Sequence, residues 1–144
     1  METNPAGACA LCAPPAPQVS LWSDERVRVV DAREPGYPGY CRVIWRAHVR
    51  EMSDLSESER RHLMAVVWAV ERALRELMAP DKINLASLGN RVPHLHWHVI
   101  PRFRDDAHFP DVVWAPARRR APPGRGLEAL ALRRALRAAL GGAA

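Results

Sequence analysis

Three histidines alternate with apolar residues in the segment 93–101, which reads Pro-His-Leu-His-Trp-His-Val-Ile-Pro. Because successive side chains of a β-strand point to opposite faces, we expect His94, His96 and His98 to share one face at intervals of roughly 6 to 7 Å. Imidazoles in such a row are typical of a metal site or a catalytic surface, since a buried imidazole needs a hydrogen-bond partner. The segment therefore predicts a strand with one chemical face and one core face.

A second chemical motif is the Cys-x-x-Cys pair formed by Cys9 and Cys12 in a segment rich in Ala, Pro and Gly. Such a pair serves zinc binding or redox chemistry in proteins kept in a reducing compartment, and two ligands alone do not decide between a metal site and free thiols. A thioredoxin-like role is disfavoured because the pair does not open a helix after a strand.

Length and composition indicate one globular domain. The 144 residues are too few for two ordinary domains, and no apolar run approaches the roughly 18 to 20 residues of a membrane span. The first 18 residues lack the basic and apolar regions of a signal peptide, so we expect a cytoplasmic protein with no membrane association. A net charge of +5 suits an anionic partner without naming one.

Several elements must position these residues. Ser56 and Glu59 form a capping-box pattern, and the apolar residues that follow recur at helical spacing until Pro80, which predicts one long helix. Strands and a second, C-terminal helix are expected over 26–31, 41–46, 83–88, 94–100 and 127–140, with the first two strands joined by a turn into an antiparallel pair. The fold class is therefore α+β, with an antiparallel sheet, a long helix and a C-terminal helix.

The chain divides into three parts by composition. Residues 1–20 form an irregular arm with the Cys-x-x-Cys pair, 21–104 form the domain proper, and 105–144 form a tail rich in Pro and Arg that ends in the short helix. We interpret the arginine run of the tail, 118–120, as a solvated stretch rather than a nucleic-acid site.

The histidine segment resembles the His-x-His-x-His-x-x signature of the histidine-triad (HIT) family of nucleotide hydrolases and transferases. Two further segments are similar to that family: Ala47-His48-Val49, followed by Met52-Ser53-Asp54-Leu55 and a capped helix, and Pro101-Arg102 after the triad. The resemblance covers residues from about 20 to 104, and it favours the branch that acts on dinucleoside polyphosphates. Trp45-Arg46 stands where many members have Pro-Lys.

The resemblance implies a homodimer that binds a nucleoside phosphate along the histidine strand. His96 would be the nucleophile that attacks the α-phosphorus to form a nucleotidyl-histidine, and His98 would contact the phosphate and the bridging oxygen. Asn84 and Asn90 stand where the family places polar groups near the α-phosphate, and ordinary structural roles are the alternative for both.

By analogy with the family's fold, Val29 and Ile44 would contact the base, and Asp31 would bind the ribose hydroxyls. The resemblance also implies a structural zinc ion held by four residues: Cys9, Cys12, His48 and His94. The donor set Cys₂His₂ is complete for a closed tetrahedral site.

The function expected from the resemblance is hydrolysis of a dinucleoside polyphosphate, such as diadenosine tetraphosphate, or of a nucleoside phosphoramidate, at the α-phosphate. Two alternatives stay open. One is a zinc-stabilised nucleotide-binding or regulatory module without turnover. The other is a nucleotidyltransferase, which would use the same residues and differ only in passing the nucleotidyl group to an acceptor other than water.

Overall fold

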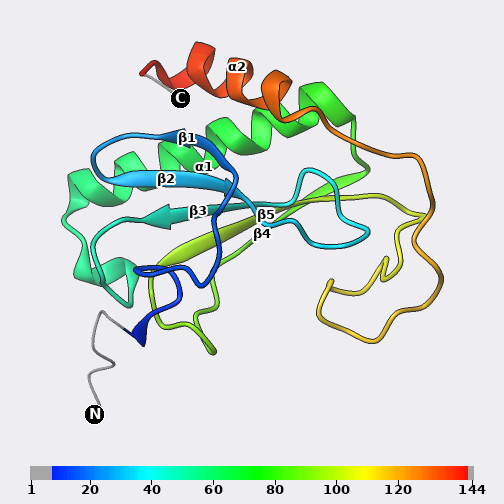
Figure 1. Cartoon of the computed structure of the whole chain (residues 1–144), viewed down its shortest axis with the longest axis horizontal. Helices are drawn as coiled ribbons and strands as arrows, with labels where there is room; N and C mark the ends of the chain where they lie inside the picture. Colours follow the sequence, from blue (N-terminus) through cyan, green and yellow to red (C-terminus); the bar gives the residue numbers. More distant parts are fainter. Residues whose placement is uncertain (1–7, 143–144) are drawn as a thin grey trace.

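A five-stranded antiparallel sheet and two helices make up the described part of the chain, residues 8–142, in this computed structural model (Figure 1). The strand order is β1-β2-β3-β5-β4. Residues 1–7 of the arm and 143–144 of the tail lie outside the described residues. The elements are β1 (Ser20–Ser23), β2 (Val27–Asp31), β3 (Cys41–Trp45), a 3₁₀ turn η2 (Met52–Asp54), α1 (Glu57–Met78), β4 (Lys82–Ala86), β5 (His96–Arg102) and α2 (Ala129–Leu140).

The expected antiparallel pair is present as β2 and β3, with Val29 opposite Val43. The connecting turn passes very close to the end of α1 at Gly39, whose φ is +82°. The positive φ favours glycine there, and a Cβ atom at this position would lie 2.6 Å from the Sδ of Met78, so a larger residue would also have to displace that side chain.

β1 is a strand that the sequence did not predict, because four residues are too few to show a periodic pattern. It extends the sheet beyond β2, with Trp22 opposite Val29. The indole N–H of Trp22 donates to the Gly141 carbonyl at 2.8 Å, which joins this edge of the sheet to the end of α2. Tertiary contacts therefore stabilise a strand that lacks a local signal.

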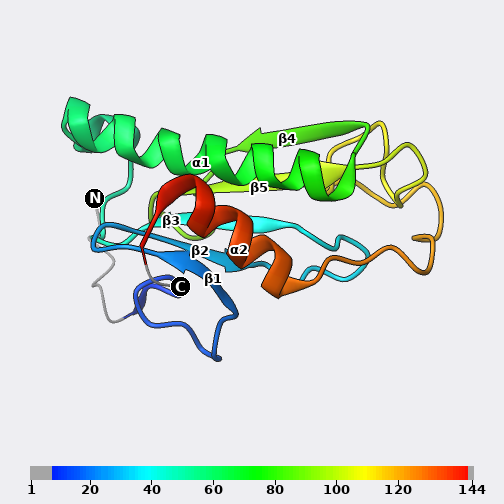
Figure 2. The same ribbon diagram turned by 90° about the horizontal axis from the view of Figure 1, so that it is seen from above.

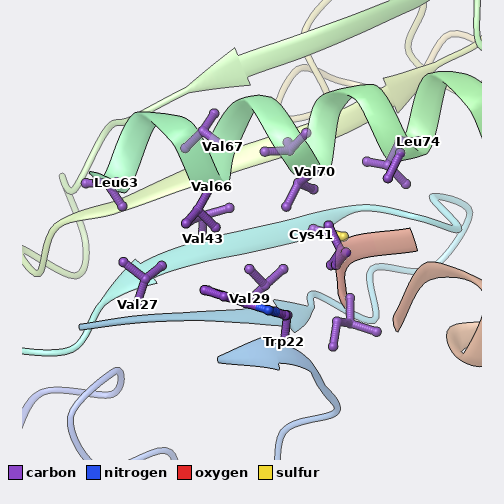
Figure 3. Packing of buried hydrophobic residues seen from close by; sticks show 14 of the residues in the cluster. Trp22, Val27, Val29, Cys41, Val43, Leu63, Val66, Val67, Val70 and Leu74 are labelled. Atoms are coloured by element: carbon purple, nitrogen blue, oxygen red, sulfur yellow. The ribbon is translucent and has the colours of Figure 1, made fainter. Parts of the chain in front are cut away.

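The long helix α1 begins as its capping box predicts: the Ser56 side chain accepts from the backbone N–H of Glu59, and the Glu59 carboxylate accepts from that of Ser56. It ends at Ala79, in a left-handed conformation directly before Pro80. Its buried face packs on the sheet, as Figure 3 shows. Neither helix in the described range is long and apolar enough to cross a membrane.

α2 starts at Ala129, two residues later than expected, and packs beside α1 on the same face of the sheet (Figure 2). Its Leu132 and Leu136 enter the core together with α1 and the inner residues of β2, β3 and β5. Both helices thus cover one face, and the opposite face is left for the N-terminal arm and the histidines.

The histidine strand begins later than the sequence predicted. β5 starts at His96, and His94 lies in a bend before it. The backbone N–H of Leu95 donates to the Val49 carbonyl, and that of Trp45 donates to the Leu95 carbonyl, so residues 94 and 95 are held by the loop after β3. The regular alternation therefore applies to His96 and His98, while His94 is directed by this loop.

Candidate active site and metal cluster

The register of β3 and β5 defines which side chains share the face that the helices leave open. Ile44 lies opposite His96, and Arg42 lies opposite His98. Directly opposed residues of an antiparallel pair project to the same side, so all four side chains belong to one face. On the other face of the two strands, Val43 and Val99 are fully buried in the core, and Trp97 packs against it partly buried. As expected from the alternation of side chains, one face of these strands carries the histidines and the other face packs in the core.

A pocket of about 710 Å³ opens on this face. The two strand histidines and Arg42 form its floor, while the N-terminal arm, from Ala10 to Gln18, forms an apolar wall rich in proline. Leu11 packs with Ile44, Val30 and Val92 in a small buried cluster beneath that wall. The pocket therefore combines an apolar side with a row of polar groups, as sites for amphiphilic ligands do.

His96 presents an unprotonated nitrogen. Its Nδ1 lies 2.5 Å from the carbonyl oxygen of His94, and this nitrogen must be the N–H donor because a carbonyl can only accept. The other nitrogen, Nε2, then carries the lone pair of the neutral ring. Burial lowers the pKa of His96, so the ring is neutral near pH 7. A neutral imidazole with a fixed tautomer is suited to nucleophilic attack.

His98 has the opposite arrangement. The hydroxyl of buried Tyr40 lies 2.7 Å from its Nδ1, and burial raises the pKa of Tyr40 to about 12, so the phenol keeps its proton. Burial, followed by the neighbouring His96 and Arg42, lowers the pKa of His98 to about 4. When the Tyr40 hydroxyl donates to Nδ1 of the neutral ring, the proton of His98 is on Nε2. His98 can then donate a hydrogen bond to a ligand.

Four side chains form a metal-binding cluster, and the two cysteines among them flank Ala10 and Leu11, which line the pocket. The ligand atoms of Cys9, Cys12, His48 and His94 all lie within 4.8 Å of one another. The Sγ of Cys12 is 3.4 Å from His48 Nδ1 and 3.3 Å from His94 Nδ1, and the two Nδ1 atoms are 3.1 Å apart. Edges of a tetrahedral zinc site with two sulfur and two nitrogen ligands are about 3.3 to 3.8 Å long. These residues can hold a metal ion.

The tautomer of His94 supports this assignment. Its Nε2 lies 2.5 Å from the Trp45 carbonyl and therefore carries the proton, so its Nδ1 has a free lone pair directed at the cluster. A metal-ligating histidine commonly donates its other ring N–H to a carbonyl in this way. The donor set fits a metal with affinity for nitrogen and sulfur.

The remaining residues expected at the site are placed in different ways. Asp31 and Asn90 line the pocket, whereas Ile44 is fully buried beneath the arm. Val29 has no exposed surface and packs between the sheet and the helices (Figure 3), and Val30 shares the histidine face in its place. The base contact expected of Val29 by analogy with the family's fold would need that side chain on the histidine face, where Val30 lies instead.

Asn84 lies on β4 and is joined to a second polar network. Its Oδ1 accepts from Arg102 at 2.8 Å, and the guanidinium of Arg102 also donates to both carboxylate oxygens of Asp106 and to the carbonyl of Asp111. Arg102 and Asp106 are each 2% exposed. This network anchors the chain that follows β5, which brings Trp114 to the pocket rim with its ring 5.1 Å from that of His98.

Sequence reasoning missed Tyr40 and Arg42. Arg42 had a readable signal, since a charged residue between Cys41 and Val43 on a predicted strand must face away from the core. That this face is the one carrying His98 depends on strand register, which the sequence alone does not specify. Tyr40 precedes its strand, so it carried no periodic signal.

Comparison with known proteins identifies the family. The HIT-domain family model matches residues 14–105. The chain is 31% identical over 85 residues to the AP-4-A phosphorylase of Mycobacterium tuberculosis, covering 55% of this chain and 44% of that protein. It is 30% identical over 87 residues to the asymmetrical bis(5'-nucleosyl)-tetraphosphatase of Schizosaccharomyces pombe, covering 57% and 48%. The chain thus spans less than half the length of these curated relatives.

Solved structures of histidine triad proteins share this fold. A zinc-bound histidine triad family protein from Mycobacterium smegmatis superposes with a TM-score of 0.64 at 26% identity, covering 91% of this chain and 94% of that one. The expected α+β architecture is therefore confirmed.

Proposed function

Since the chain belongs to the HIT-domain family, we propose that it hydrolyses nucleotides at the α-phosphate, with dinucleoside polyphosphates as the substrate class and His96 as the nucleophile. The observation that carries this proposal is the pair of histidines in one pocket: Nε2 of His96 is unprotonated because its Nδ1 donates to a carbonyl, and Nδ1 of His98 is paired with the Tyr40 hydroxyl. The activities for which the two curated relatives are named support the substrate class.

The reaction takes two displacement steps. Nε2 of His96 attacks the α-phosphorus in line, the bond from phosphorus to the bridging oxygen breaks, and Nε2–H of His98 donates a hydrogen bond to the departing oxygen, which leaves as a phosphate anion. Water then attacks the phosphorus of the nucleotidyl-histidine and the phosphorus–nitrogen bond breaks, which releases the nucleotide, gives the proton of the water to solvent and restores the neutral His96 ring. Asp31 and Asn90 hold the nucleotide, through the ribose hydroxyls and the phosphate oxygens respectively. Asn84 acts indirectly, by holding Arg102.

A second candidate differs only in the acceptor. The relative from M. tuberculosis is named a phosphorylase, and transfer to inorganic phosphate instead of water would use the same two histidines. Product analysis separates these reactions, because phosphorolysis yields a nucleotide with one more phosphate than hydrolysis does.

We assign zinc to the cluster of Cys9, Cys12, His48 and His94, in a structural role. A closed site with four protein ligands leaves no position for substrate, and it would hold the arm that forms the pocket wall. The zinc-bound relative supports the identity of the metal. The alternative of a binding module without turnover is disfavoured by the unprotonated Nε2 of His96, which suits a nucleophile.

The test is turnover of diadenosine tetraphosphate by the wild-type protein and by His96→Asn, with and without added phosphate. We expect release of AMP by the wild type, and a loss of at least about 10³-fold in the variant because the nucleophile is absent. Equal turnover by both proteins would remove His96 from its role. Binding without turnover in the wild type would favour the regulatory module, and equilibrium sedimentation of the same samples tests the proposed homodimer.

A further inference from the structure

Arg42 is a cation in the pocket with no described partner. Its guanidinium makes no hydrogen bond or ion pair within residues 8–142, and it lies 5.9 Å from the centre of the Tyr40 ring. The side chain is only half-buried, but it lines the pocket beside His96 and His98. Five N–H donors facing a pocket without an acceptor indicate a site for an anion.

Other buried or half-buried arginines in the described range have structural partners. Arg28, on the same face of the sheet, donates to the side chain of Gln18 and the carbonyl of Leu11, and so ties the arm to β2. Arg102 is fully engaged by Asn84 and the loop after β5. Arg42 therefore differs from these arginines in having free N–H donors, and a role in folding does not account for a charge at this position.

The register places Arg42 next to the expected chemistry. It lies directly opposite His98, and the neighbouring residue of its strand on the same face, Ile44, lies opposite His96. Opposed Cβ atoms are about 4.5 to 5.5 Å apart, so a side chain as long as arginine reaches across to both imidazoles. Arg33 and Arg91 also line the pocket, but both are exposed, and solvent screens their charges.

We propose that Arg42 binds the α-phosphate of the nucleotide and stabilises the negative charge that its oxygens carry as His96 attacks. This inference rests on the proposed function for the reaction, although the phosphate contact itself can be tested without turnover. Arginine suits the task because its planar donors match phosphate oxygens in pairs and its charge persists at any physiological pH.

The test measures binding in a His96→Asn background, where no substrate is consumed. Adenosine and AMP are titrated by calorimetry into this protein and into the same protein carrying Arg42→Met or Arg42→Lys. We expect Arg42→Met to weaken AMP binding by about 10- to 100-fold, which is the range of a charge-assisted contact, and to change adenosine binding by less than about 2-fold. Arg42→Lys keeps the charge and loses less.

Arg72→Gln provides the matched control, since it removes one positive charge from an exposed position of α1 on the other side of the sheet. It should leave both affinities unchanged.

Two results would overturn the proposal. Equal weakening of AMP and adenosine binding by Arg42→Met would mean that the guanidinium contacts the base or shapes the pocket, and no weakening of AMP binding would mean that it does not contact the phosphate. If Arg42→Met does not fold, the affinities of Arg42→Lys are compared with those of Arg72→Gln instead. A phosphate contact then predicts that Arg42→Lys weakens the binding of AMP and leaves that of adenosine unchanged. Failure of the wild type to turn over any nucleotide would refute the proposed hydrolysis and leave this result standing.

Discussion

Replacing Tyr40 by Phe removes a single oxygen from the site. The Tyr40 side chain is 2% exposed and that of His98 is 7% exposed, so no water replaces the lost hydroxyl easily. Nδ1 of His98 would then be buried without its partner at 2.7 Å. Leaving such a group unsatisfied costs about 1 to 3 kcal/mol. We expect Tyr40→Phe to lower the free energy of unfolding in urea by about that amount.

The catalytic effect of this change is more specific. When the Tyr40 hydroxyl donates to Nδ1, it confines the proton of the neutral His98 ring to Nε2; without that donor, the departing group loses part of its hydrogen-bond donor. A nucleoside phosphoramidate expels an amine, a poor leaving group that depends on such a donor, whereas a 4-nitrophenyl ester of AMP expels a stable anion. We expect kcat for the phosphoramidate to fall by about 5- to 100-fold, and kcat for the ester to change by less than about 3-fold.

The comparison of these two substrates also provides the refutation. A purely structural role for Tyr40 predicts equal losses on both, because a distorted pocket does not distinguish leaving groups. Equal losses, or no loss on the phosphoramidate, would show that the hydroxyl does not control the proton on His98. His96→Asn serves as the control that abolishes both reactions.

Three further predictions concern stability and metal content. Because the pKa of His98 is lowered to about 4, the unfolded chain binds more protons below pH 6.5; His98 should therefore lower stability by about 2 kcal/mol between pH 7 and pH 5, and in urea titrations His98→Asn should reduce the fall by about that amount while the part due to His94 and His96 remains. Asp106→Asn leaves the guanidinium of Arg102 buried without its carboxylate and should cost about 3 to 5 kcal/mol, whereas a loss below 1 kcal/mol would contradict the network. Elemental analysis should find about one zinc ion per chain and much less in Cys12→Ser, and wild-type protein prepared without zinc loss yet holding none would exclude the site.

Local signals were sufficient for most of the fold. The capping box at Ser56, the periodic stripe of α1 and the alternation in β2 and β3 each act within a few residues, and each is present as predicted. β1 was missed because its four residues are ordered by Trp22 and by pairing with β2, which are contacts across the fold. Local chemistry thus specifies elements, while distant contacts decide short or marginal ones.

For the candidate site too, local sequence signals predicted one part, and contacts between distant segments determined the rest. The types and spacing of the histidines pointed to the chemistry, but which strand residues share their face depends on register. Neighbouring residues of a strand face opposite sides of the sheet, so Val29, which the family analogy assigned to the base, lies in the core, and Val30 lies on the histidine face. Tyr40 and Arg42 could be recognised only once β3 was aligned with β5.

His94 belongs to both centres at once. Its imidazole is part of the metal cluster, and its carbonyl oxygen accepts a hydrogen bond from Nδ1 of His96, so one residue contacts both the cluster and the proposed nucleophile. A shift of this main chain would be transmitted simultaneously to both. Substitutions at His94 therefore report a mixture of metal loss and nucleophile misalignment, and mutants in the cysteine arm are the cleaner way to learn whether the ion tunes the reaction rate.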